Sequence, residues 1–212
     1  MKRWVQTAAI TIGAVSLAGC SESVGIEDAT SSVAEIENQK DNVIAYINEI
    51  LAQEEEMLEG FEEDLAENEA ELFSAREAQV FANLEERESH LAAINDSAQA
   101  MQMENDIIAT VLEDGDSEEL PMDELEQLNE QTASLHNELN EFVETYGSEL
   151  QTQDDYFSGL GEDSDFEFLA DGIETVNEAQ EDVHELLESI HDELLTTEAA
   201  LEDVEISEEA SS

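Results

Sequence analysis

Residues 166–204 read FEFLADGIETVNEAQEDVHELLESIHDELLTTEAALEDV, and this stretch decides the fold class of the chain. Its apolar residues recur at alternating steps of three and four: Phe166, Leu169, Ile173, Val176, Val183, Leu187, Ile190, Leu194, Leu201 and Val204. Gln180 and Thr197 occupy the two remaining positions of this series. This rhythm puts one apolar stripe along one side of a helix, whereas a strand alternates with period two. The stretch therefore predicts a long helix that packs on partners through a coiled-coil-like seam.

The same spacing runs through three earlier stretches, so the chain as a whole is predicted to be helical. We expect four helices, near residues 32–72, 75–113, 120–158 and 164–205, each of about 40 residues and about 60 Å. With one proline and no period-two segment, the sequence predicts an all-α fold. Similar lengths and short connections favour one domain over residues 32–206, an elongated antiparallel up-and-down four-helix bundle. If the first two helices continue through Phe73–Arg76, the alternative is a longer three-segment bundle.

Boundary signals stand between these stretches. Ser32, Ser74 and Ser164 each precede a glutamate by three positions, the spacing of a capping box that satisfies free amides at a helix start. Pro121 is expected in a first helical turn, where its missing N–H costs little. The Gly/Asp/Ser-rich segments 113–119 and 158–165 are predicted to be loops.

The N-terminus indicates export and lipid attachment. Met1-Lys2-Arg3 is followed by a short apolar run that ends in Leu17-Ala18-Gly19-Cys20, with the only cysteine of the chain. A basic start, an apolar run and small residues at a cleavage site are typical of a secretory signal. Small residues that end at a cysteine resemble the bacterial lipobox, formed here by Leu17, Ala18, Gly19 and Cys20. That resemblance implies a diacylglyceryl group on the Cys20 sulfur and cleavage before Cys20.

The two ends of the chain are predicted to lie outside the helical domain. Residues 1–19 are the expected lipoprotein signal peptide, 20–31 a lipidated N-terminus with a flexible tether, and 207–212 an acidic C-terminal tail. Two acyl chains give stable anchoring, at about 0.8 kcal/mol per buried methylene. We expect the protein on the extracytoplasmic face of the cell membrane, with no cofactor beyond this covalent lipid.

The charge balance excludes several partners. The chain has 58 acidic residues, a net charge of −53, and only three basic residues beyond Arg3, namely Lys40, Arg76 and Arg87. Nucleic acid and other polyanions would be repelled, while cations would gather diffusely around the chain. The scarcity of lysine suggests a habitat of concentrated salt, where the Debye length is about 3 Å at 1 M and repulsion is screened.

No arrangement of residues predicts catalysis, so we expect a protein that is not an enzyme. Glu181-x-x-His184 and Glu188-x-x-His191 match the Glu-x-x-His pattern of di-metal bundles, but both lie on one predicted helix and their glutamates flank its seam. We therefore predict surface histidines and no specific metal site. His90 and His136 have no catalytic spacing, the acidic segment 114–119 lacks a calcium-loop pattern, and Met101 and Met103 are expected to pack in the core.

One stretch carries a family resemblance. Residues 156–190, YFSGLGEDSDFEFLADGIETVNEAQEDVHELLESI, combine an aromatic-Leu turn at Tyr156 and Leu160, a helix restart and the dipeptide Val176-Asn177. In this the chain resembles the YkyA family of cell-wall-binding lipoproteins of Gram-positive bacteria, over roughly residues 15–205. The resemblance implies a four-helix bundle and an association with the wall, and it transfers no catalytic residue. The near-absence of lysine departs from the Lys/Glu mixture of that family.

Three functions follow from the sequence. The first is an exported, membrane-anchored lipoprotein with a non-enzymatic role in the envelope, bound to the cell wall through peptidoglycan. The second is a lipoprotein that binds cations or metals through its carboxylates and histidines. The third is an adaptor whose helix face docks an envelope or membrane protein.

Overall fold

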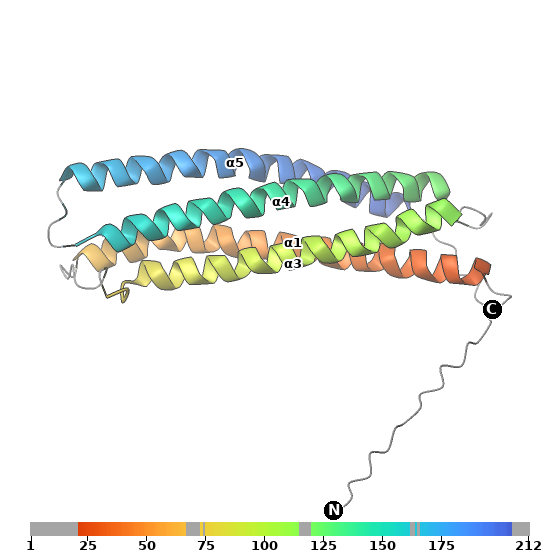
Figure 1. Ribbon diagram of the computed structural model, residues 1–212, viewed down its shortest axis with the longest axis horizontal. Helices are drawn as coiled ribbons and strands as arrows, with labels where there is room; N and C mark the ends of the chain where they lie inside the picture. Colours follow the sequence, from red (N-terminus) through yellow and green to blue (C-terminus); the bar gives the residue numbers. More distant parts are fainter. Residues whose placement is uncertain are drawn as a thin grey trace, which may run out of the picture.

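The computed structural model describes residues 21–66, 73, 75–114, 120–161, 164 and 166–204. Four long helices make up this part: α1 (Ser21–Ala66), α3 (Gln79–Asp114), α4 (Met122–Gly159) and α5 (Phe166–Asp203). They run up and down along one long axis, and no strand occurs among the described residues (Figure 1). The all-α, elongated antiparallel four-helix bundle predicted from the sequence is confirmed, and the three-segment alternative is wrong.

The core consists of the apolar stripes themselves. On α5, Val176, Val183, Ile190 and Thr197 are seven residues apart and all are buried. On α4 the buried set follows the same rhythm of three and four: Leu125, Leu128, Leu135, Leu139, Phe142 and Tyr146. Burying a side chain of this size contributes about 1.5–3 kcal/mol. This regular burial is the coiled-coil-like packing that the spacing predicted.

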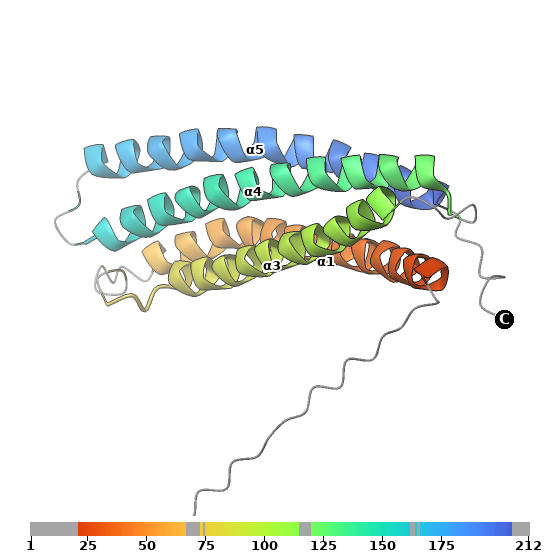
Figure 2. The same ribbon diagram turned by 45° about the vertical axis from the view of Figure 1, so that its right-hand side comes forward.

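Helices that are consecutive in the sequence pack against each other, whereas the first and last helices make little contact. α1 packs along α3, α3 along α4 and α4 along α5, whereas α1 and α5 make only a few contacts. The start of α1 and the end of α5 lie at the same end of the bundle (Figures 1 and 2). Toward the opposite end, α5 lies apart from α1 in both views.

The sequence predicted a flexible tether over residues 20–31, and this prediction is wrong for residues 21–31. These residues form the first three turns of α1. Ala29 is fully buried and packs in a core cluster with Ile36, Ile108 and Leu125, while Ile26 lies against that cluster. Ser32 lies inside this helix and donates a hydrogen bond to Glu104 Oε2 of α3 at 2.7 Å, so it caps no helix start. The three-four spacing continues back to Ile26, and burial of these residues outweighs the turn preference of Ser and Gly.

The first connection also differs from its prediction. α1 ends at Ala66 and α3 begins only at Gln79, whose backbone N–H donates to Asp64 Oδ2 at 2.7 Å. The Asp64 carboxylate of α1 therefore caps the start of α3. The sequence predicted a capping box at Ser74 for this helix start, and Ser74 lies outside the described residues. Arg76 has φ of 58°, in the left-handed region, and its backbone N–H donates to Phe73 O at 3.1 Å.

Candidate functional site

Each of the three basic residues within residues 21–212 pairs with an acidic residue of another helix. Lys40 of α1 pairs with Glu198 of α5, and Arg87 of α3 lies near Glu54 of α1. Arg76, in the turn before α3, pairs with Asp154 of α4, Nη2 to Oδ1, at 2.7 Å. In a chain with 58 acidic residues, the few cations therefore serve to hold separate helices together.

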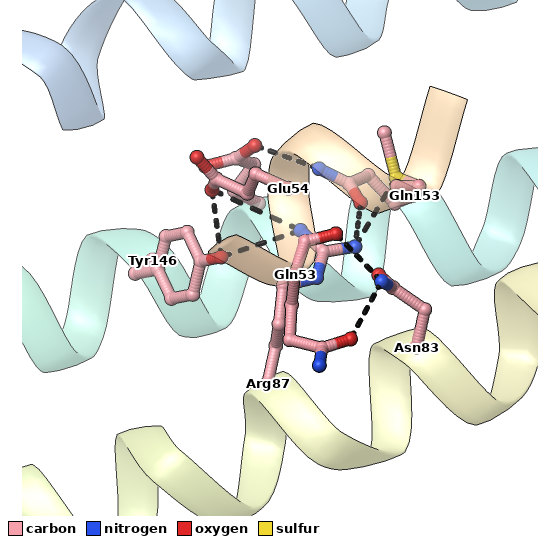
Figure 3. Close-up of polar contacts among 8 residues, drawn as sticks. Gln53, Glu54, Asn83, Arg87, Tyr146 and Gln153 are labelled. Carbon is pink, nitrogen blue, oxygen red and sulfur yellow. Dashed lines mark hydrogen bonds and ion pairs between the residues drawn. The ribbon is translucent and has the colours of Figure 1, made fainter. Parts of the chain in front are cut away.

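Arg87 is the centre of a buried polar cluster made by three helices (Figure 3). Its Nη2 donates to Gln153 Oε1 at 2.6 Å, and its Nη1 donates to the Tyr146 hydroxyl at 3.2 Å. Tyr146 in turn donates to Glu54 Oε1 at 2.7 Å, and Glu54 lies 3.8 Å from Arg87 Nη1. A buried guanidinium is costly unless its donors find such partners. Both Nη atoms of Arg87 have partners and its Nε has none among the described residues, so the polar contacts of Arg87 with α1 and α4 are all made by the two Nη atoms.

Glu149 extends the cluster on α4. The Gln153 side chain donates to Glu149 Oε1 at 2.7 Å, and Glu149 Oε2 has no hydrogen-bond partner within the described residues. Burial, and next the negative charge of Glu54, raise the pKa of Glu149 to about 7, although Arg87 and the Gln153 hydrogen bond act in the opposite direction. Glu149 is thus a buried carboxyl group that changes charge near neutral pH.

The arrangement around Arg87 is that of a structural tie. Arg87, Tyr146 and Gln153 are fully buried and Glu149 nearly so, and burial raises the pKa of the Tyr146 phenol. Asn83 of α3 adds a further link, because its amide donates to the backbone oxygen of Gln53 of α1 at 2.6 Å. General acid–base or nucleophilic chemistry requires contact with a substrate, and these side chains contact one another.

The other two cations differ in exposure. The Lys40 side chain is 4% exposed and also lies 3.4 Å from Asp41, Nζ to Oδ1. The Arg76 side chain is 48% exposed; besides Asp154 it donates to the Ser158 hydroxyl at 3.0 Å and lies over the Phe81 ring, 4.4 Å from its centroid. Lys40 is thus a buried cation that links α1 to α5, whereas Arg76 is a surface cation that links the turn before α3 to α4.

A shallow hollow lies between α4 and α5, in the segment that carries the family resemblance. It has a volume of about 450 Å³ and is lined by Thr152, Asp155, Tyr156, Phe168, Asp171, Gly172 and Thr175. The Tyr156 and Phe168 rings stack across the two helices with their centroids 6.2 Å apart. Phe168 is 41% exposed, and Asp155, Asp171 and Thr175 are exposed beside it. The hollow offers an aromatic face edged by carboxylates and hydroxyls.

Comparison with known protein families gives a match for this bundle. A family model described as "YkyA: Putative cell-wall binding lipoprotein" matches residues 25–205, which include nearly all of the four helices. The chain belongs to the YkyA family. No curated protein and no solved structure gives a significant match.

The family match gives no site residues, so the roles of individual residues rest on their positions. The expected lipobox residues of this YkyA family member, Leu17, Ala18, Gly19 and Cys20, lie outside the described residues, as do the signal peptide and the acidic tail. The same holds for most of the acidic segment 114–119. Among the helices that the structure describes, none is long and apolar enough to cross a membrane.

The histidines occupy two different settings. Glu181, His184, Glu188 and His191 are exposed on α5, as the seam predicted, and His184 Nε2 lies 3.6 Å from Glu188 Oε1. In the described part of the chain, no three His, Cys, Asp or Glu side chains gather as metal ligands would. His136 is half-buried; its Nδ1 lies 3.0 Å from Ala98 O and its Nε2 2.9 Å from the Asn140 amide nitrogen. The His90 ring lies 6.0 Å from that of Tyr46.

One core prediction is wrong. Met101 is fully buried, but Met103 is 62% exposed on α3. Two positions along a helix turn the side chain by about 200°, so Met101 and Met103 cannot both face the core.

The sequence did contain a signal for the buried cations. The apolar rhythm of α1 skips one position between Ile36 and Val43, and that position is Lys40. The rhythm of α3 skips one position between Leu84 and Leu91, and that position is Arg87. A basic residue at a skipped seam position predicts a buried cation with an acidic partner on another helix. Which acidic residue it pairs with could not be read from the sequence.

Proposed function

We propose that this protein is a non-enzymatic lipoprotein of the cell envelope, anchored through Cys20 to the extracytoplasmic face of the membrane and associated with peptidoglycan. The match to the YkyA family over residues 25–205 is the observation that carries this function. The position of α1 supports it, because α1 begins at Ser21, directly after the expected lipid attachment site, and its 46 residues correspond to about 70 Å. A rod of that length reaches from the membrane surface into the wall space.

The charge of the chain restricts what it contacts in the wall. Anionic wall polymers would be repelled by a net charge of −53, whereas peptidoglycan offers sugars with hydroxyl groups and small apolar faces. The hollow at Tyr156 and Phe168 suits such a ligand, because an aromatic face packs on apolar patches and carboxylates accept hydrogen bonds from hydroxyl groups. We infer that this hollow is the wall contact.

Pelleting with sacculi tests the wall association. The part of the chain from Ser21 to Ser212, which holds all four helices and both core clusters, is mixed with sacculi stripped of anionic polymers in about 1 M salt. Saturable pelleting is expected, and no pelleting above a control without sacculi would contradict it. Phe168→Ala and Asp171→Asn should each reduce pelleting, while Met103→Ala, at an exposed apolar residue of α3, should leave it unchanged.

A separate experiment tests the anchor. Cys20→Ala in the full chain should abolish incorporation of a labelled fatty acid and release the protein from the membrane fraction. Labelling that persists in this variant would contradict lipid attachment at Cys20, without bearing on the pelleting result.

A further inference from the structure

A groove runs between α1 and α5, the two helices that barely meet. It has a volume of about 490 Å³, and its floor and walls are mostly apolar: Ile44, Ile47 and Leu51 of α1 with Leu187, Ile190, Leu194 and Leu195 of α5. Lys40 and Glu198 also line it, and their ion pair joins the two helices at one end. The polar residues Asp41, Asn48 and His191 complete its edge.

α1 carries an exposed apolar stripe along and beyond this groove. Ile44 is 38% exposed, Leu51 39%, Leu58 61% and Leu65 47%, and the four residues follow one another at intervals of seven. Residues seven apart lie on one face of a helix, so these side chains form a single seam. Because the helices are antiparallel, the stretch of α1 from Leu51 to Leu65 runs opposite the stretch of α5 that leads from Leu187 back to Ile173, itself 47% exposed.

We propose that this groove is a docking site for an amphipathic helix of a partner protein, with one apolar face and basic residues on its flanks. Three of the four possible seams between adjacent helices of the bundle are packed, and the α1–α5 seam is left open with its apolar residues in place. A helix laid into an apolar groove uses anchors at such heptad spacing. The span from Ile44 to Leu65 corresponds to about 30 Å, so the partner helix has about three heptads.

Charge decides between a partner protein and a second copy of this chain. The residues four positions after Leu51 and Leu58 are Glu55 and Glu62, both exposed, so acidic groups follow the stripe on its solvent side. Asp41 and Glu198 lie at the groove itself. A second copy would bring a like charge of −53, whereas a helix with Lys or Arg flanks is attracted to this rim.

A designed probe tests the site. The probe is a 21-residue helical peptide with leucines at heptad a and d positions and lysines beside them, and its control is a scrambled peptide of the same composition without an apolar face. Residues 21–212 of the protein are titrated with each peptide in about 1 M salt, after circular dichroism has verified that the protein is helical. One-to-one, saturable binding of the amphipathic peptide is expected, at least about tenfold tighter than that of the scrambled one.

Matched variants locate the binding on the protein. Leu51→Glu with Leu58→Glu places two charges in the proposed seam, and Met103→Glu with Ile107→Glu places two charges at exposed apolar residues of α3. Both double variants make the protein more acidic, so attraction by charge alone would strengthen with either. We expect the groove variant to bind the amphipathic peptide at least about tenfold more weakly and the α3 variant to bind it no more weakly than the unaltered protein.

Three results would overturn the proposal. The first is equal binding of the scrambled peptide, which would reduce the attraction to charge. The second is groove-variant binding as tight as that of the α3 variant, which would place the peptide elsewhere. The third is a dimer of the unaltered protein, seen by sedimentation in about 1 M salt and dissolved by Leu51→Glu with Leu58→Glu, which would make a second copy the occupant.

Discussion

Tyr156 of α4 lies so close to Gly172 of α5 that a β-carbon at position 172 would come within 2.2 Å of the tyrosine ring. The relationship is reciprocal, since a β-carbon at Gly159 of α4 would lie 2.9 Å from the Phe168 ring of α5. Each of these two aromatic rings therefore occupies the place of a missing side chain on the other helix. This exchange sets the close approach of α4 and α5 beside their connecting turn.

Gly172→Ala is expected to lower the free energy of unfolding by about 1–3 kcal/mol, because the added methyl group displaces the Tyr156 ring. Gly147→Ala is the matched control: a β-carbon there would lie 3.7 Å from Leu91 Cδ2, an ordinary contact. That change should stabilise the protein by about 0.5–1 kcal/mol, since alanine favours a helix interior. Urea unfolding of both variants measures the difference, and equal effects would contradict the close approach.

Arg87→Ala should destabilise the bundle by about 3 kcal/mol, because it leaves Tyr146 and Gln153 buried without their partner. Arg76→Ala removes an arginine that also joins two helices, but the side chain is 48% exposed and its pair with Asp154 is screened by water. We expect a much smaller loss for Arg76→Ala. Similar urea midpoints for the two variants would show that the buried cluster contributes no more than a surface pair.

Glu149 should make the stability of the fold depend on pH near neutrality. The pKa of Glu149 is about 7 in the folded protein, whereas its ordinary value is 4.5. The contribution of protonated Glu149 to stability is therefore complete below pH 4.5 and is lost as the pH rises through 7. Between about pH 5 and pH 8 the free energy of unfolding of the unaltered protein should fall by about 2–3 kcal/mol relative to Glu149→Gln. Glu144→Gln, an exposed change on α4, is the control, and parallel pH curves for all three proteins would contradict the prediction.

Salt should stabilise the bundle. Between about 0.01 M and about 1 M the Debye length falls from about 30 Å to about 3 Å, which screens the repulsion among 58 acidic residues. The melting temperature followed by circular dichroism should therefore rise over this range. A falling melting temperature would mean that the few interhelical ion pairs outweigh the general repulsion.

The sequence by itself determined the fold class, because apolar residues at steps of three and four commit every long segment to an amphipathic helix. It also determined the low number of cations and their seam positions, at Lys40 and Arg87, where the rhythm skips a step. The extent of α1 was missed, because the turn preferences of Ser and Gly in residues 21–31 are weaker than the burial of Ala29 against α3 and α4.

The tertiary structure alone decided how the helices meet. The pairing of Arg87 with Gln153 and Tyr146, and of Lys40 with Glu198, depends on the register between helices, which a chain with 58 acidic candidates leaves open. The open α1–α5 seam was equally out of reach, because an apolar stripe has the same spacing whether a neighbour covers it or not. Only the packing shows that Leu51 and Leu58 face solvent while Ile50 lies in the core.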